Sequence, residues 1–127
     1  MPVDMNPVMP TDRQLVQSYG DGRFKVTGAV YQGSIIVFPE HTQLWPAVTV
    51  GDVCIESLHP ITNAADQVDI LLLGCGPQFV AIPKGLRTAL KDFGIVLEWM
   101  DSGAACRTFN VLVAEERRVA AAVLAVD

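Results

Sequence analysis

Cysteine, basic residues and long apolar runs are all scarce in this chain of 127 residues. Its three cysteines are widely spaced, with no C-x-x-C pair and no histidines at metal-ligand spacing, so we expect neither a disulfide framework nor a metal site. Nine Lys and Arg against fourteen Asp and Glu give a net charge of −5, which argues against nucleic acid as a partner because phosphate binding needs a basic face. No segment reaches the roughly 18 apolar residues of a membrane-spanning helix, so we expect no membrane insertion.

The beginning of the chain also lacks hydrophobic periodicity. Residues 1–14 contain three prolines and no apolar run typical of a signal peptide, which predicts a flexible N-terminal arm and a cytoplasmic protein with reduced thiols. Half of all residues are hydrophobic, and a domain has roughly 100 to 200 residues. Residues 15–127 are therefore predicted to form one globular domain.

The first half of this domain shows β-prone runs. The runs RFKVTGAVY and SIIVF stand on either side of Gln32-Gly33, which predicts a hairpin over residues 23–38, with Gly28 in a bulge. The pattern over residues 39–67 is weaker. It allows a short strand over Leu44–Val50, and Pro60 is expected to end early any helix around residues 54–58.

The second half alternates between strand and helix patterns. VDILLLG, residues 68–74, predicts a strand in the middle of a sheet because it is continuously apolar. A helix from Pro83 to Gly94, with Phe93 on its buried stripe, a strand over residues 95–100, a helix over residues 103–116 and a strand over residues 119–126 are expected to follow. This alternation predicts an α/β fold with an added N-terminal hairpin.

Two loops are candidates for ligand binding. Gly74-Cys75-Gly76 follows the buried strand, and glycines let backbone N–H groups approach an anion. Asp101 and Ser102 begin the last helix, where free N–H groups gather, and Arg107 adds a positive charge. If the two preceding strands are parallel neighbours, both loops open at the same sheet edge. The alternative is that the glycines form a tight turn, the polar residues cap the helix and the arginine is solvated.

The thiols are the only candidates for nucleophilic catalysis. Cys106 lies near a helix start, which would lower the pKa of its thiol if the thiol were exposed, and Cys75 could lie nearby. Neither cysteine has an identifiable base, because His41 and His59 lie in the weakly patterned middle of the chain. We therefore assign no catalytic residue and no cofactor.

Two other residues are candidates for binding a partner protein. Val111 lies off the apolar stripe formed by Ala105, Phe109 and Leu112, so the last helix is predicted to be covered on two sides. Trp45 stands beside Pro46 in a predicted loop, and large aromatic rings are enriched at interfaces. The alternative is that this indole folds over the edge of the sheet.

Three stretches carry a family resemblance, which spans about residues 15 to 126. They are EWMDSGAACRTFNVLVAEERRVAAAVL, VDILLLGCG and RFKVTGAVYQGSIIVFP. Together they resemble a family of small uncharacterised bacterial and archaeal proteins related to mitochondrial respiratory complex I assembly factor 3. The chain departs from the family pattern at Cys75, where we expect Thr, at Ser102 (Thr), at Phe109 (Tyr) and at Glu116 (Gly). A hydroxyl residue at position 75 in relatives argues against an indispensable thiolate there.

The resemblance implies a single three-layer domain with a central mixed β-sheet, and two main C-terminal helices follow from the pattern. It also implies a role in building complex I rather than catalysis. The leading hypothesis is thus a non-catalytic domain that binds a protein, such as a respiratory-chain assembly intermediate, and a homo-oligomer is left open. The alternative is a small-molecule or anion-binding protein, which could be an enzyme, that uses residues 74–76 and the start of the last helix.

Overall fold

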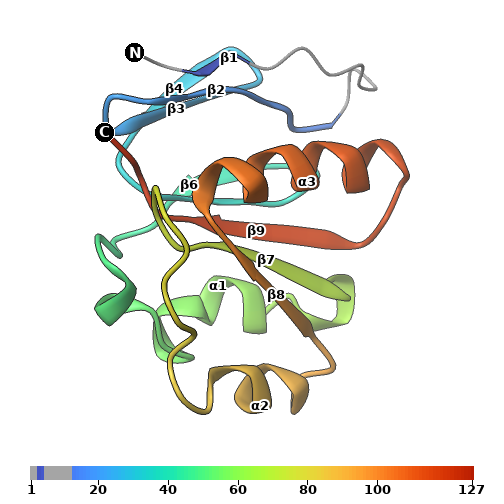
Figure 1. Ribbon diagram of the computed structural model, residues 1–127. Helices are drawn as coiled ribbons and strands as arrows, with labels where there is room; N and C mark the ends of the chain where they lie inside the picture. The colour runs from blue at the N-terminus through green and yellow to red at the C-terminus, as the bar shows by residue number, and fades with distance from the viewer. Residues whose placement is uncertain (1–2, 5–12) are drawn as a thin grey trace.

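The computed structural model describes residues 3–4 and 13–127, which form two β-sheets and three α-helices (Figure 1). The antiparallel four-stranded sheet has the order β1 (Val3–Asp4), β2 (Val16–Gly20), β3 (Arg23–Val26) and β4 (Ala29–Gln32). The mixed five-stranded sheet has the order β6 (Thr42–Leu44), β5 (Ile35–Val37), β9 (Val119–Val123), β7 (Ile70–Gly74) and β8 (Val96–Met100). The helices are α1 (His59–Thr62), α2 (Leu86–Lys91) and α3 (Ser102–Ala114).

The order of the parallel strands explains why helices cover both faces of the five-stranded sheet. β7 pairs in parallel with both β8 and β9, so the chain moves outward from β7 to β8 and then back across β7 to β9. Crossovers are right-handed, so these opposite moves place α2 and α3 on opposite faces. Figure 1 shows α3 on one face and α1 with α2 on the other. This confirms the predicted three-layer α/β domain with a central mixed sheet.

Each face of the central sheet has its own hydrophobic core. One cluster contains the side chains of Ile36, Leu71, Leu97 and Trp99 with residues of α1 and α2, and the other contains Leu72 with residues of α3 and the small sheet. Every residue of β9 is buried, as expected for a strand with neighbours on both sides and packing on both faces. β7 is likewise an interior strand, as the run VDILLLG predicts.

The four-stranded sheet packs over the outer side of α3, so this helix lies between two sheets (Figure 1). The amide of Asn110 joins the two layers: its Oδ1 accepts from Val16 N–H at 3.0 Å and its Nδ2 donates to Val16 C=O at 2.9 Å. The side chain of Asn110 thus replaces a neighbouring strand for one residue of β2. Because Asn110 is 2% exposed, these main-chain groups have no access to water as a substitute.

An N-terminal hairpin exists, but the predicted pairing of RFKVTGAVY with SIIVF is wrong, because Ile35–Val37 forms β5 in the central sheet. β3 and β4 pair across Thr27-Gly28, whose φ angles of 47° and 85° are those of a two-residue hairpin turn with both residues left-handed. Gly28 is therefore a turn residue rather than a bulge. Gly33, the predicted turn, instead lies where the chain passes from the small sheet to the central sheet. The sequence does not distinguish these two positions, because Thr-Gly is a weaker turn signal than Asn-Gly and because β-prone residues stand on both sides of Gln32-Gly33 as well.

Three details of the middle segment and α2 also differ from expectation. Phe93 is 46% exposed, because α2 ends at Lys91 and the helical period no longer applies two residues later. The predicted strand over Leu44–Val50 is wrong: β6 ends at Leu44, before Pro46. The 3-10 helix Glu56–Leu58 ends before Pro60, as expected, but α1 begins directly after it with Pro60 in its first turn, where the missing N–H has no cost.

The predicted flexible arm, residues 1–14, lies mostly outside the described residues. Within it, β1 pairs with β2, and Gln14 donates its N–H to Pro39 C=O and accepts from Thr42 Oγ1. Gln14 is therefore part of the hydrogen-bonded fold, one residue before the predicted domain boundary.

The role of Asn110 gives a stability prediction. Replacing it in N110A leaves a buried N–H and a buried C=O of Val16 without partners, so we expect the free energy of unfolding to fall by about 2–4 kcal/mol. Urea denaturation measures this loss. V111A is the matched control on the same helix, because Val111 is 54% exposed, and it should change stability by less than about 0.5 kcal/mol. Equal effects of both variants would contradict the assigned role.

Candidate functional site

The two loops proposed as a ligand site do meet, at the carboxyl ends of β7 and β8. Their main chains are bonded directly: Cys75 N–H donates to Met100 C=O and Ser102 N–H donates to Gly76 C=O, both at 2.8 Å. The Ser102 hydroxyl accepts from Gly76 N–H at 3.0 Å and donates to Leu124 C=O at 2.7 Å. One buried hydroxyl thereby links the exits of β7 and β9 to the start of α3.

Gly74 is required at this junction for packing rather than for anion binding. A Cβ atom at this position would lie 2.8 Å from Ser102 Cα and 2.9 Å from Val123 Cγ1. The backbone of α3 and the neighbouring strand therefore approach β7 more closely than any side chain allows. This close contact between α3 and the sheet explains the glycine at position 74.

Four of the backbone N–H groups that could bind an anion, those of Cys75, Gly76, Ser102 and Ala104, already donate within the protein. Cys75 and Gly76 donate within the junction, and Asp101 Oδ1 accepts from Ala104 N–H at 2.9 Å as the cap of α3. The carboxylate of Asp101 thus already stabilises the positive end of the helix. Arg107, the proposed anion partner, instead donates to Tyr19 Oη at 3.3 Å, toward the small sheet. The site residues are together, but their polar atoms serve the fold.

The cysteines do not form a reactive pair. All three thiols are free, and only Cys54 is exposed. Burial raises the pKa of Cys106 to about 12, the opposite of the lowered pKa that exposure at a helix start would give. Cys75 Sγ lies 3.4 Å from both Gln78 O and Val80 N. His41 stacks on Phe38, and His59 pairs with Asn63.

The two residues predicted to bind a partner differ in exposure. Val111 is exposed on α3, although the second covered side of this helix is the one that carries Asn110, not Val111. Trp45 is only 3% exposed, so the expectation of a projecting interface anchor is wrong for this ring. Its Nε1 donates to Ser57 C=O at 2.8 Å, which fastens the ring to the segment before α1. This is the alternative in which the indole folds over the sheet edge.

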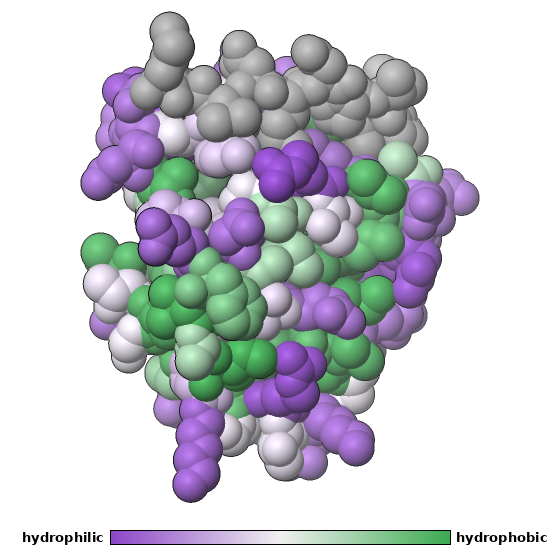
Figure 2. Space-filling view, viewed as in Figure 1, coloured by the Kyte–Doolittle hydropathy of each residue, from purple (hydrophilic) through white to green (hydrophobic). Residues whose placement is uncertain are grey.

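Large hydrophobic side chains are nevertheless exposed elsewhere. Figure 2 shows a hydrophobic area over the segment between β7 and α2, where Phe79 is 67% and Val80 is 45% exposed. Val96 on β8 is 55% exposed because α3 covers β7 and β9 more than it covers β8. Neighbouring exposed apolar residues such as Phe79 and Val80 are a feature of interaction sites, whereas single ones such as Val96 are common on any protein surface.

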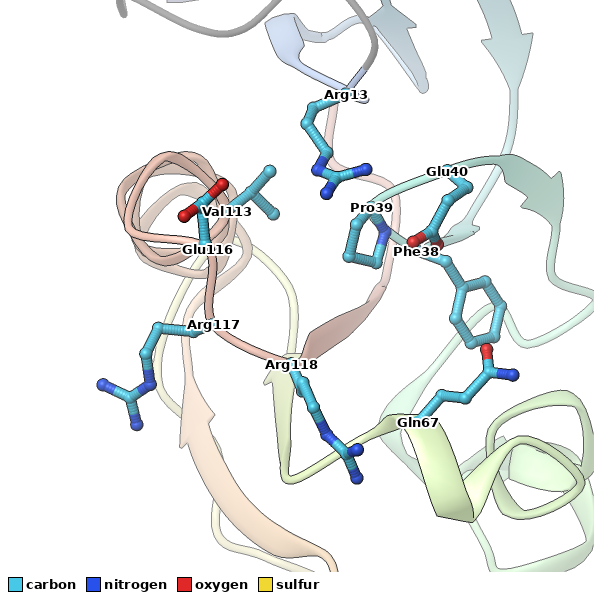
Figure 3. Close-up of a pocket in the computed structure, with 9 residues that line it drawn as sticks. All are labelled: Arg13, Phe38, Pro39, Glu40, Gln67, Val113, Glu116, Arg117 and Arg118. Carbon is cyan, nitrogen blue, oxygen red and sulfur yellow. The ribbon is translucent and has the colours of Figure 1, made fainter.

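A small pocket of about 120 Å³ lies at the other end of α3 (Figure 3). Arg13 points into it between Val113 and Pro39, while Arg118 bonds to Asp66 C=O and the Asp69 carboxylate. Carboxylates also line the pocket, so its charge is mixed. Within residues 3–4 and 13–127, no group of three or more His, Cys, Asp or Glu side chains is arranged to hold a metal ion. The described residues that line this pocket therefore do not point to a particular ligand or reaction.

The end of α3 beside this pocket explains why the family pattern has glycine where this chain has Glu116. Glu116 has a left-handed backbone with φ of 60°, and its N–H donates to Val113 C=O while Arg117 N–H donates to Leu112 C=O. These two bonds are the glycine-terminated helix ending known as the Schellman motif. The glycine expected at position 116 from the resemblance thus has a conformational reason.

These features define a class of protein: a mixed α/β domain whose strand exits at the carboxyl edge of the central sheet, in the part described, are joined by structural hydrogen bonds. The chain belongs to the family described as protein of unknown function DUF498/DUF598, whose model matches residues 16–124. None of the described helices has the length and hydrophobicity needed to cross a bilayer.

The chain is similar to both bacterial and animal relatives. It is 36% identical over 109 residues to an uncharacterised protein of Rhodobacter capsulatus, covering 86% of this chain and 82% of that protein. It is 31% identical over 110 residues to NADH dehydrogenase [ubiquinone] 1 alpha subcomplex assembly factor 3 of Danio rerio, covering 87% of this chain and 63% of that protein. The chain therefore spans less than two thirds of the fish assembly factor.

Solved structures share the fold over nearly the whole chain. A Bartonella henselae protein described as an outer membrane protein superposes with a TM-score of 0.85 at 34% identity, covering 92% of this chain and 98% of that one. A Mth938-like domain from Bordetella pertussis superposes with a TM-score of 0.77 at 26% identity, covering 98% and 92%. The resemblance of the sequence to this family is confirmed.

The close contact at Gly74 gives a second prediction. In G74A the new methyl group meets the Ser102 backbone, which cannot swing aside, so we expect stability to fall by about 1–3 kcal/mol. Thermal and urea unfolding measure the change. The control is G51A, where a Cβ atom has only an ordinary contact at 3.5 Å, and which should be neutral or slightly stabilising. A neutral G74A would show that the junction is looser than described.

The buried thiol of Cys106 predicts how stability depends on alkaline pH. The unfolded chain releases this proton near the ordinary pKa of 9.0, whereas the folded chain holds it to about pH 12. The unfolded state therefore binds fewer protons between these values, and stability falls as pH rises from 9 toward 12. Denaturation curves of the native protein and C106A at pH 8, 9.5 and 11 test this. The loss should be smaller in C106A, and parallel losses would refute the assignment.

Proposed function

We propose that this chain is a non-catalytic, cytoplasmic protein-binding domain that takes part in assembling a respiratory complex. The observation that carries the proposal is its 31% identity, over 87% of its length, to an animal complex I assembly factor. Two features of the molecule support it. The polar atoms at the sheet's carboxyl edge are engaged in structural bonds, and several large apolar side chains are exposed on the described surface.

The alternative function, binding of a small molecule or anion, has less support from the geometry. It would need free N–H groups at Gly74–Gly76 and at the start of α3, but Cys75, Gly76 and Ser102 all donate to partners within the protein. A ligand there would have to break these bonds before forming its own. Binding of a partner protein at another surface would leave these hydrogen bonds intact.

Deletion of the gene in the organism that encodes this chain tests the proposal. We expect fully assembled NADH:quinone oxidoreductase to fall severalfold on native gels, because an assembly factor is needed before the complex is complete. Succinate dehydrogenase activity in the same membranes should not change, and it is the internal control. Reintroducing the intact gene should restore the complex. Normal amounts of the complex in the deletion strain would refute the proposal.

A further inference from the structure

The two edges of the five-stranded sheet differ in how their free backbone groups are treated. β8 forms one edge and β6 forms the other. At the β8 edge, parallel pairing of Val96 and Met100 with β7 leaves the main-chain groups of Leu97 pointing outward, and the Arg87 guanidinium donates to Leu97 C=O. This edge is therefore partly capped by a basic side chain, as is common where a protein blocks unwanted strand pairing.

The edge at β6 has no such cap. Phe38 N–H donates to His41 C=O, and Trp45 N–H donates to Ser34 C=O, which fixes the alternation of hydrogen-bonded pairs between β5 and β6. Thr42 and Leu44 therefore point their N–H and C=O groups away from β5. Among the described residues, no hydrogen bond is made to these groups. The β6 edge is thus a short, open template for another strand.

A groove of about 490 Å³ lies beside this edge. Its apolar lining residues are Ile36, Leu44, Trp45, Pro46, Ala47 and Pro60, and among them Leu44 is 57% exposed. The bond from Trp45 Nε1 to Ser57 C=O holds its walls together, so the groove is built into the fold and does not depend on a loop closing. Trp45 therefore contributes a wall of a binding groove instead of a projecting anchor.

The groove is acidic. Its described lining includes Asp52 and Glu56 and no basic residue. Asp52 Oδ2 accepts from Val48 N–H at 2.9 Å and from Thr49 N–H at 3.1 Å, which fixes this carboxylate and lowers its pKa. Glu56 is exposed and free to meet a ligand. The charge favours a basic partner and disfavours a second copy of this chain, since pairing two β6 edges would bring two acidic grooves together.

We propose that this groove binds an extended peptide segment of a partner protein, which pairs with the β6 edge and carries a hydrophobic side chain and, two residues away, a lysine or arginine. The pleat gives the reason for the spacing. Gln43 lines the groove, so the partner residue opposite Gln43 directs its side chain to the same face, into the apolar part. A basic side chain two residues further along the partner strand points to the same face and reaches Glu56. The inference rests on the proposed protein-binding function and specifies the chemistry of the partner.

Peptide selection on the whole chain tests the inference even though the partner is unidentified. A phage-displayed library of random peptides is panned against the protein at low salt, and the enriched peptides are synthesised. We expect peptides with a hydrophobic and a basic residue two positions apart, binding that weakens as salt is raised, and perturbed amide resonances at Thr42 and Leu44 in NMR spectra. Failure to enrich peptides, or enrichment of peptides without basic residues, would overturn the inference.

Three variants locate the binding. E56K reverses a groove charge and should weaken binding of the selected peptides by about threefold to tenfold. L44P removes an outward N–H that makes no bond to β5, so its fold should persist while strand pairing is lost. E98K makes the same charge change on the opposite edge strand, and it should bind normally. Circular dichroism checks the fold of each variant. Normal binding by both E56K and L44P, or a loss in E98K, would overturn the inference.

Two further outcomes separate this inference from the function on which it rests. If the deletion strain has normal amounts of respiratory complex, the proposed function fails, yet peptide binding at β6 is still measured independently. If the intact gene restores the complex and E56K and L44P restore it equally well, the assembly role stands and the groove is not its binding site. Dimerisation abolished by L44P would assign the groove to a second copy and overturn the peptide inference.

Discussion

The hydroxyl of Ser102 connects three parts of the chain that are far apart in sequence. It accepts from Gly76 N–H after β7 and donates to Leu124 C=O after β9, while its own residue begins α3. The absence of a side chain at Gly74 lets the helix lie directly on the strand exits. Because α3 is the crossover between β8 and β9, and its first residue is bonded to the exits of β7 and β9, its position helps to fix the parallel arrangement of these strands. The rest of the central sheet depends on this junction.

The junction also makes the carboxyl edge of this sheet differ from that of many α/β proteins. Such folds usually place ligands where strand exits leave N–H groups unbonded at a helix start. Here those groups bond to one another, and Asp101 occupies the positive end of α3. The surfaces that we propose for recognition therefore lie elsewhere, at exposed apolar side chains and at the open side of β6. This placement agrees with a relationship to assembly factors.

The second constraint on the fold is that α3 is packed between the central sheet and the four-stranded sheet. The helix buries one side on the central sheet and another beneath the small sheet, where Asn110 pairs with Val16 like a strand residue. Tyr19 packs so close to Gly103 that a Cβ atom there would lie 2.4 Å from its hydroxyl. A helix placed between two sheets needs small residues where the layers approach, and the run of Ser102, Gly103 and Ala104 supplies them.

Local patterns in the sequence were sufficient for the C-terminal half of the fold. Continuous apolar runs identify β7 and β9, and helical spacing with a polar cap identifies α3, because these signals come from neighbouring residues that share one element. The turn at Thr27-Gly28 was missed because two glycines compete in one β-rich segment, and only pairing partners decide between them. The burial of Trp45, the occupied N–H groups of the ligand loop and the groove beside β6 depend on contacts between segments distant in the chain. Only the tertiary structure decides such features, since nothing in the residues next to Trp45 or Cys75 specifies what packs against them.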